Sequence, residues 1–556
     1  MVANSAFIFD LLDPMKVSSI QGDPMKANLH FFEAQSGHPS VRLDFGDGRR
    51  IHLHSTVEPE RESHYLKATE IWGDCVVILG VGLGYQLESL LPALKKAQTV
   101  VIIDVYEEFV SMAAKTFKNK VNQLVCLTPT QRERLVEHTQ NYESVQVLRH
   151  PASHRAHADL YNQIETHLLS ARRHPTPSPN QKRRVLLLKG HFFLEEESAA
   201  AFTDDPRIEL STLDYRVHDA EKSLPQRFQA LVEKEKPEVI LTVGFKGCDR
   251  EGRILELADR YGIPVCVWFL DDPRPNVLAF QNFMGKEVHA FSWESAYLPW
   301  LRAKGFKSAS LLPLASCNRV FSKPISKETR FALSFVGSSM GDAYLNAIRK
   351  KFLWSPDLEP LVQEKAAALL AGHTNAVDLT HQALPFSDEK NKTWLTSLII
   401  HTASHAKRVA VCAQLLPENL SIIGDPKSWQ SLLGSGAQCL PAVDYYSELP
   451  SIYQQSAISL NITSCQMPTA VNQRVFDVPL AGGFLLSDPQ NDAVVLFEED
   501  REIVVYRSIE EAVDKARFYQ SQPARRAAIS EAARSRILGE HLIEHRLQKM
   551  MKHFFN

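Results

Sequence analysis

Short apolar runs of strand length alternate with amphipathic stretches through most of the chain. One set of apolar runs lies at 185–188, 238–243, 264–270, 289–292 and 310–314, and a second at 332–335, 420–423, 458–461, 484–486 and 503–506. Amphipathic stretches such as 224–236 and 251–261 lie between them. Strands that alternate with helices predict parallel, doubly wound sheets, with ligands beyond the carboxyl ends of the strands. The pattern therefore predicts an α/β chain with two Rossmann-like lobes, 184–325 and 326–556.

The chain before residue 184 divides into three further parts. Residues 1–70 predict a small β-rich cap, because Asp47-Gly48 stands between alternating apolar and polar residues and favours a hairpin turn. His52 and His54 alternate there and are interpreted as polar residues on one sheet face. Residues 71–171 predict an accessory Rossmann-like domain. Residues 172–183 contain three prolines among polar and basic residues, which favours an extended linker.

A glycine-rich turn in the accessory domain suggests a ligand loop. Gly80, Gly82 and Gly84 follow the apolar run 75–79, and Asp104 follows the next run, about 20 residues later. Such a loop lets a nucleotide or S-adenosylmethionine approach the backbone, and an acidic residue at this spacing can bind ribose. A purely structural turn is the alternative. Methyltransferases usually carry an acidic residue two before the first glycine, where this chain has Ile78, so methyl transfer is disfavoured.

The stretch 471–488, VNQRVFDVPLAGGFLLSD, predicts a helix that stops at two glycines and is followed by a buried strand. Arg474 and Asp477 stand three apart and are therefore neighbours on this helix. A guanidinium suits a phosphate and a carboxylate suits sugar hydroxyls, so the pair predicts a site for a phosphorylated, ribose-bearing ligand. A surface ion pair is the alternative.

The run RVFDVPLAGGFLLSD resembles the signature of CgeB-like glycosyltransferases, a group with the GT-B fold. The resemblance extends more weakly over 185–550, through phrases such as VWFLDDPR and FVGS. It implies a donor-binding second lobe, an acceptor-binding first lobe and a ribose contact from Asp477. The chain departs from the signature by having Asp for Glu at 477 and by Pro479 inside the helix.

Two phrases near the N-terminus resemble motility-associated flagellin-modification proteins of bacteria. These are LHSTVEPERES, through Ser55, Pro59 and Glu62, and ILGVGLGYQLESLL. The resemblance implies a protein acceptor such as flagellin, although a polysaccharide acceptor remains open.

Sugar transfer from a nucleotide donor requires that the leaving diphosphate be neutralised and that the acceptor be positioned and sometimes deprotonated. The sequence offers Arg474, Asn472 and the turn Gly337-Ser338-Ser339 for the diphosphate. Asn461 ends an apolar run and either faces the same crevice or caps the next helix. For an inverting mechanism, which takes its base from the first lobe in GT-B enzymes, His191 and Asp271 follow strands of that lobe and are the candidates. Turn or cap residues are the alternative for both, and a retaining mechanism would need neither.

Composition and residue spacing restrict the partners, location and cofactors that this protein is expected to have. A net charge near −3 over 556 residues gives no case for nucleic acid. The eight cysteines are dispersed, and no signal peptide or apolar span is evident, so a cytoplasmic enzyme without an integral membrane segment is expected. The spaced pairs His150/His154 and His401/His405 lack completing ligands, so no metal is predicted. We expect no permanently bound cofactor, and a UDP-, GDP-, dTDP- or CMP-linked sugar as substrate. A methyltransferase and a non-catalytic GT-B-shaped binding protein are the competing hypotheses.

Overall fold

The computed structural model describes residues 27–64, 71–142, 144–171, 181–217, 223–280, 283–322, 328–381 and 384–555. The chain divides into two compact units. The first comprises 1–186, 213–238 and 253–264, and the second comprises 187–212, 239–252 and 265–556. Most of the predicted linker, 172–180, lies outside the described residues. Within the described part of the chain, no helix has both the length and the apolar character needed to cross a bilayer.

The first unit begins with a three-stranded antiparallel sheet, as the predicted hairpin requires. Its strands are β1 (Asn28–Glu33), β2 (Pro39–Asp44) and β3 (Arg50–His52), and a 3-10 turn, η1 (Pro59–His64), follows. Gly48 closes the β2–β3 turn at φ 88°, a conformation that glycine adopts without strain. His54 lies beyond β3 and is buried, so its interpretation as a polar residue on a sheet face is wrong.

A four-stranded parallel sheet follows in the order β6-β5-β4-β7. Its strands are β4 (Cys75–Leu79), β5 (Thr99–Ile103), β6 (Leu124–Leu127) and β7 (Val145–Arg149). The helices of this unit are α2 (Tyr85–Leu94), α3 (Glu107–Phe117), α4 (Arg132–Thr139), α5 (Pro151–Ala156), α6 (Ala158–Ala171), α8 (Leu224–Glu235) and α9 (Arg253–Tyr261). β4 and β5 have the predicted bounds. The strand order reverses between β4 and β7, so a crevice opens there at the carboxyl edge.

The second unit contains two six-stranded sheets, and the first has the order β13-β12-β11-β10-β8-β9. Its strands are β8 (Arg183–Lys189), β9 (Ile208–Asp214), β10 (Val239–Val243), β11 (Val265–Phe269), β12 (Val288–Ser292) and β13 (Ser308–Leu311). β8 and β9 extend into the first unit. The accompanying helices are α7 (Glu195–Asp204), α10 (Pro273–Val277), α11 (Leu298–Ala303) and α12 (Asn318–Phe321). β9 was not predicted, because its sequence IELSTLD is not an apolar run and only Ile208 and Leu213 are buried.

The other sheet of this unit has the order β16-β15-β14-β17-β18-β19, and its neighbouring strands are parallel. Its strands are β14 (Leu333–Val336), β15 (Leu420–Gly424), β16 (Gln438–Pro441), β17 (Ser459–Asn461), β18 (Leu485–Ser487) and β19 (Val504–Val505). Its helices are α16 (Pro426–Leu433), α17 (Leu449–Gln454), α18 (Arg474–Leu480), α19 (Asn491–Leu496) and α20 (Ile509–Gln520). The order reverses between β14 and β17, which places the ligand crevice of this sheet between those strands.

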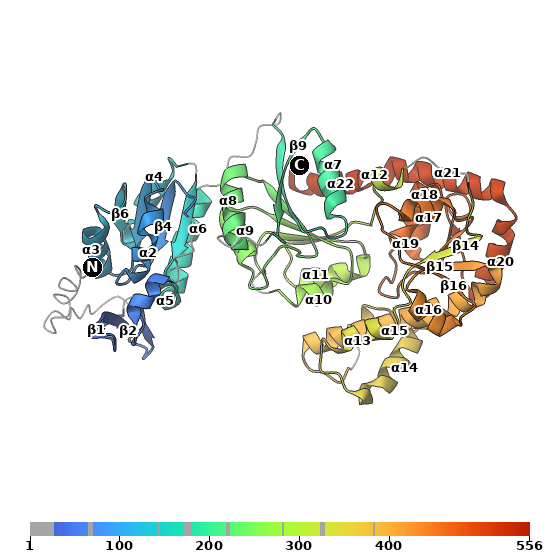
Figure 1. Ribbon diagram of the computed structural model, residues 1–556, viewed down its shortest axis with the longest axis horizontal. Helices are drawn as coiled ribbons and strands as arrows, with labels where there is room; N and C mark the ends of the chain where they lie inside the picture. The colour runs from blue at the N-terminus through green and yellow to red at the C-terminus, as the bar shows by residue number, and fades with distance from the viewer. Residues whose placement is uncertain are drawn as a thin grey trace. The chain divides into compact units, whose positions relative to one another are not determined.

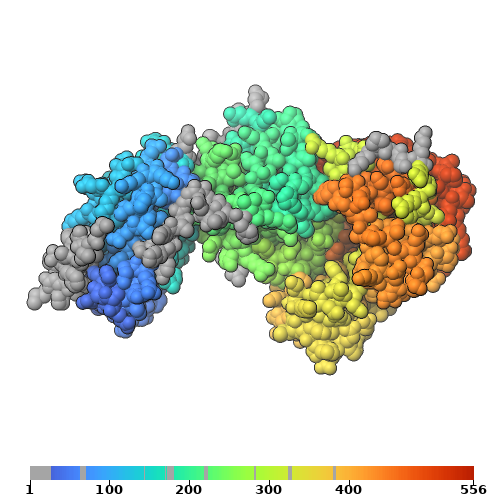
Figure 2. Space-filling model, in the orientation of Figure 1, coloured from blue at the N-terminus to red at the C-terminus, as the bar shows by residue number. Residues whose placement is uncertain are grey.

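A helical insertion separates β14 from β15. It consists of α13 (Asp342–Arg349), α14 (Glu359–Leu370) and most of α15 (Glu389–Leu415), and it has a hydrophobic core of its own. Figure 2 shows it in yellow as a protrusion of the second unit. Two helices, α21 (Pro523–Glu540) and α22 (Ile543–Phe555), close the chain, and α22 lies beside α7 of the first sheet (Figure 1). Arg546 of α22 donates to the Leu314 carbonyl oxygen at 2.9 Å, so the terminal helix returns to the first lobe. The prediction of an α/β chain with Rossmann-like parallel sheets is confirmed.

Candidate functional site

A pocket of about 360 Å³ lies at the strand-order reversal of the second lobe. The predicted residues Gly337, Asn472, Arg474 and Asp477 line it. Its other lining residues are Phe193, Val336, Met340, Arg408, Tyr445, Leu449, Tyr453, Ser464, Gln466, Met467 and Gln473. The short strands β14 and β17 end beside this pocket. The helix α18 begins there, with Gln473 at its N-cap, after the loop 462–472. The carboxyl edge of the sheet thus collects the residues that the sequence pattern suggested.

Two arginines that come from different helices, α15 and α18, line this pocket. Arg474 donates from Nε to the Val336 carbonyl oxygen at 2.9 Å. Arg408, on α15, donates from Nη1 to the Ser338 carbonyl oxygen at 2.7 Å. Both guanidinium groups lie near the ring of Phe335, at 5.3 Å for Arg474 and 5.9 Å for Arg408. Burial, together with the charge of Arg474, lowers the pKa of Arg408 to about 10.

Neither arginine forms an ion pair with a carboxylate among the described residues. Asp488, whose charge acts on Arg408, pairs with Lys407 at 2.6 Å instead. Two neighbouring cations that are held by neutral carbonyl oxygens leave positive charge uncompensated in a partly desolvated pocket. Such a pair stabilises an anion with several oxygens, such as a diphosphate.

Asn461 holds one of these arginines in place. It ends β17 and is fully buried, and its Oδ1 accepts hydrogen bonds from Arg474 Nη1 at 3.1 Å and from Asn472 Nδ2 at 2.7 Å. Its Nδ2 donates to Ser487 Oγ at 3.0 Å. Asn461 therefore does not line the pocket but supports it from behind, through Arg474 and Asn472.

Asp477 is not part of a surface ion pair, so that alternative is wrong. Its side chain is 1% exposed, and its carboxylate accepts hydrogen bonds from Ser316 Oγ at 2.6 Å, Tyr445 Oη at 2.8 Å and Gln473 Nε2 at 3.0 Å. Burial raises the pKa of Asp477 to about 7 despite these three donors. A ribose contact stays a prediction, and it requires a hydroxyl to replace or share one of these donors.

The predicted turn Gly337-Ser338-Ser339 contributes mainly through its backbone. The Gly337 carbonyl oxygen accepts from Trp429 Nε1 at 3.0 Å, and Ser339 Oγ lies 2.7 Å from Ser428 Oγ. Gly337 is the member of the turn that lines the pocket. The turn therefore holds Arg408 through the Ser338 carbonyl oxygen, and it borders the pocket at Gly337, which has no side chain.

The two candidate bases lie at the carboxyl edge of the first lobe and differ in their surroundings. Asp271 is exposed, and its Oδ1 accepts from Nε2 of the pocket residue Gln466 at 3.4 Å. Protein packed around this carboxyl raises its pKa. The adjacent Asp272 is bound to buried Arg274, whose Nε lies 2.8 Å from its Oδ1. His191 has a side chain that is 63% exposed and pairs with Glu196 at 3.0 Å. Of the two candidates, Asp271 is the one that contacts a residue of the pocket wall.

Arg408, Tyr445 and Gln466 are site residues that the sequence analysis missed. Arg408 lies within a long helix 66 positions before Arg474, and no spacing marks it. Tyr445 lies in the loop before α17, which begins at Leu449, and no motif marks it. Nothing in the sequence distinguishes Arg408 from its neighbour Lys407.

The glycine loop of the first unit is occupied by the protein itself. The Asp104 carboxylate accepts from the backbone N–H groups of Val81 at 2.7 Å and Gly82 at 3.2 Å. His54 Nε2 accepts from the N–H of Leu83 at 2.8 Å. Asp104 is 1% exposed. The donors expected to face a ligand from Gly80–Gly84 are thus bonded internally, which favours the alternative of a structural turn.

Comparisons with known proteins agree with the chemistry of the pocket. Residues 399–552 match a family described as "Glycosyl transferase-like", and this range includes Arg408, Asn461, Arg474 and Asp477. A search of curated proteins finds no match.

Solved structures give weak likenesses. Sucrose-phosphate synthase from Thermosynechococcus elongatus is 11% identical, covering 67% of this chain and 98% of its own, with a TM-score of 0.39. Anabaena HepE in complex with UDP and glucose is 10% identical, covering 67% and 99%, with a TM-score of 0.38. T4 phage β-glucosyltransferase is 10% identical, covering 67% and 99%, with a TM-score of 0.37.

Proposed function

We propose that the protein is a glycosyltransferase that moves a sugar from a nucleotide donor bound in the pocket of the second lobe. The observation that carries the proposal is the pair Arg408 and Arg474, two guanidinium groups bound to carbonyl oxygens beside an open volume of about 360 Å³. The match of residues 399–552 to a glycosyl transferase-like family supports the same reaction class.

The chemistry follows from the charges. The acceptor oxygen attacks the anomeric carbon, the bond from that carbon to the donor phosphate breaks, and the nucleotide leaves with additional negative charge. Arg408 and Arg474 stabilise that charge as it develops, a role that a pre-positioned cation performs without reorganisation. Two arginines supply the compensation that a divalent ion provides elsewhere, so we propose that the donor site works without a metal.

Asp271 is proposed as the base that removes the proton of the acceptor hydroxyl. Its raised pKa makes it a stronger base than an ordinary aspartate, and Gln466 connects it to the donor pocket. His191 remains the second candidate, although its pairing with Glu196 draws it toward a structural role.

The acceptor is proposed to be a protein, with flagellin or another surface protein as the candidate and a polysaccharide as the alternative. This proposal is supported by the phrases around Ser55, Pro59 and Glu62 and around Gly80–Gly84. We propose a cytoplasmic location, which agrees with the absence of disulfide bonds among the eight cysteines, all of which lie in described parts of the chain.

Titration calorimetry of the full chain with UDP, GDP, dTDP, CMP and S-adenosylmethionine tests the proposal. We expect one nucleotide to bind, and we expect Arg408→Gln to weaken it about 10- to 100-fold, since a hydrogen bond to a charged group contributes about 1.5–3 kcal/mol. Arg536→Gln, which removes a surface arginine of the same lobe, is the matched control and should bind as the wild type does. If Arg408→Gln bound the nucleotide as tightly as the wild type, the proposed donor site would be refuted. If S-adenosylmethionine alone bound, methyl transfer would replace sugar transfer as the proposed reaction. Binding without sugar transfer to any acceptor would leave a nucleotide-binding protein.

A further inference from the structure

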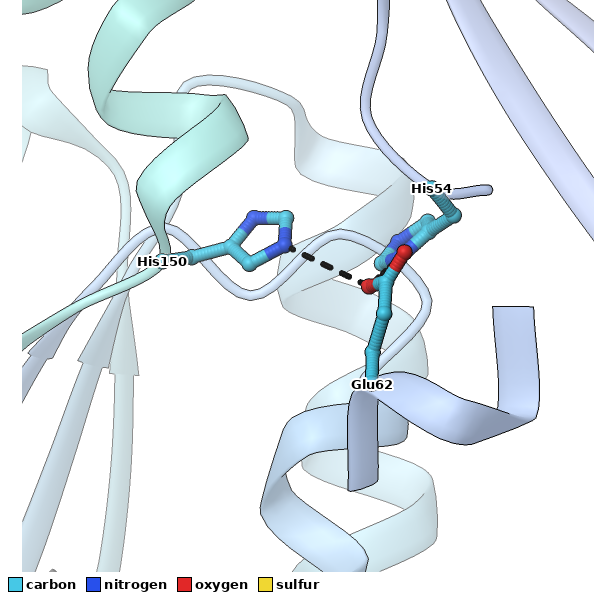
Figure 3. Close-up of side chains that lie close together, drawn as sticks. All are labelled: His54, Glu62 and His150. Carbon is cyan, nitrogen blue, oxygen red and sulfur yellow. Dashed lines mark hydrogen bonds and ion pairs between the residues drawn. The ribbon is translucent and has the colours of Figure 1, made fainter. Parts of the chain in front are cut away.

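The first unit contains a second built cavity, separate from the donor pocket. It has a volume of about 420 Å³ and lies where the strand order reverses between β4 and β7. Four of its polar lining residues are almost fully buried, namely His54, Glu62, Gln86 and His150, with exposed fractions of 2%, 8%, 3% and 3%. Figure 3 shows the side chains of His54, Glu62 and His150 pointing toward one another. A buried polar cluster of this kind is costly unless its members have partners.

His54 orients the carboxylate of Glu62. The N–H of Leu83 donates to His54 Nε2 at 2.8 Å, which places the imidazole proton on Nδ1. That nitrogen lies 2.7 Å from Glu62 Oε2 and donates to it. Glu62 Oε1 accepts from the N–H of Ser55 at 2.9 Å. A cation on His54 Nδ1 would require moving the proton to Nε2, against the N–H of Leu83, so His54 is a positioning residue.

His150 and Gln86 line the same cavity, and each has one side-chain atom without a hydrogen bond among the described residues. His150 follows β7, and its Nδ1 lies 2.7 Å from Ser153 Oγ, which fixes the orientation of the ring. Its Nε2 lies 3.9 Å from Glu62 Oε2, a distance that forms an ion pair if the imidazole is protonated but is too long for a hydrogen bond (Figure 3). Gln86 donates from Nε2 to the Val81 carbonyl oxygen at 3.1 Å, and its buried Oε1 has no hydrogen-bond partner among the described residues. The cavity therefore presents a carboxylate, an imidazole nitrogen and an amide oxygen.

We propose that this cavity binds a divalent transition-metal ion such as Zn²⁺, with Glu62 and His150 as direct ligands and Gln86 Oε1 beside them. Nitrogen and oxygen ligands suit Zn²⁺ and its neighbours in the first transition series. Two atoms that each lie about 2.1 Å from one ion are at most about 4.2 Å apart, and 3.9 Å falls within that limit. Ligand atoms of His54, Glu62 and His150 all lie within 4.8 Å of one another.

The surrounding contacts have the character of an outer shell. The His54 imidazole donates to the ligating carboxylate, and Ser153 orients the ligating imidazole, as outer-shell partners do in metal sites. Water completes the coordination, for which the cavity has room. The ion would join the N-terminal cap to the parallel sheet, because Glu62 comes from η1 and His150 follows β7. This inference does not depend on the proposed donor pocket, which lies in the other unit.

Titration calorimetry of the EDTA-treated full chain with ZnCl₂ tests this site, with bound zinc counted by mass spectrometry. We expect one ion per chain, and we expect Glu62→Gln and His150→Gln each to weaken binding by at least tenfold. Glu60→Gln, on the same 3-10 turn, and His154→Gln, on the same helix α5, are matched controls and should bind as the wild type does.

X-ray absorption at the zinc edge distinguishes this site from adventitious capture by one of the free cysteines. We expect nitrogen and oxygen scatterers with an imidazole pattern and no sulfur. No zinc on the wild type, sulfur in the first coordination shell, or equal losses in the controls and the site variants would each overturn the proposal. If circular dichroism shows Glu62→Gln to be unfolded, His150→Gln decides.

Discussion

Asp477→Asn is expected to stabilise the second unit at neutral pH. Burial raises the pKa of Asp477 from 3.8 to about 7, a shift of about 3 units, which corresponds to about 4 kcal/mol at 1.36 kcal/mol per unit. Below about pH 4 both the folded and the unfolded chain carry the proton, so the group has no effect. Between about pH 4 and 7 the unfolded chain ionises while the folded chain retains the proton, so stability falls as the pH rises. The full cost of about 4 kcal/mol applies above pH 7.

Differential scanning calorimetry of the full chain at pH 5, 6, 7 and 8 measures this effect. The free energy of unfolding of Asp477→Asn minus that of the wild type should grow with pH, because the asparagine keeps most of the hydrogen bonds and cannot ionise. In this difference, the contributions to the pH dependence from groups that titrate in both proteins cancel. Asp514→Asn, an exposed carboxylate on α20, is the control and should show no such trend. A difference that is flat from pH 5 to 8 would refute the reasoning about burial.

Three further predictions concern other parts of the molecule. Asn461→Ala should weaken nucleotide binding about tenfold, measured by calorimetry, because Arg474 loses the oxygen that holds its Nη1. Asp271→Asn should lower kcat about 10²- to 10⁴-fold with the donor Kd unchanged, and an unchanged kcat would remove it as the base. Gly82→Ala should destabilise the first unit by more than about 1 kcal/mol in urea unfolding, since its φ is 52° and a Cβ would lie 2.4 Å from a histidine nitrogen. Gly46→Ala, which meets nothing within 4 Å, is the control for that measurement.

The strands that the sequence predicted share one property. β4, β5, β14, β15, β17 and β18 are short apolar runs bounded by turn residues, and most of their residues are buried. β9 and β16 lack that signal because their residues are partly exposed at the edges of their sheets. The edge strands β13 and β19 overlap the predicted apolar runs at 310–314 and 503–506, so the local pattern detects apolar runs wherever they lie, and it misses edge strands that have none.

The donor pocket was predictable only where its residues are close together in the sequence. Asn472, Arg474 and Asp477 belong to one contiguous stretch, and ligands of parallel sheets were expected beyond the carboxyl ends of the strands, where that stretch lies. Arg408 comes from a helix 66 residues earlier, so only the packing of α15 against the sheet brings its charge to Arg474.

The sequence by itself determined the α/β architecture, the glycine turn and the charged helix of the second lobe, because each depends on residues that are close in the chain. Only the tertiary structure decided what those groups contact. Asp104 and His54 take the donors of the glycine turn, and Asp477 takes three donors instead of pairing with Arg474. A buried donor or acceptor binds whatever partner the fold brings within about 3 Å, and that partner is set by contacts between distant parts of the chain.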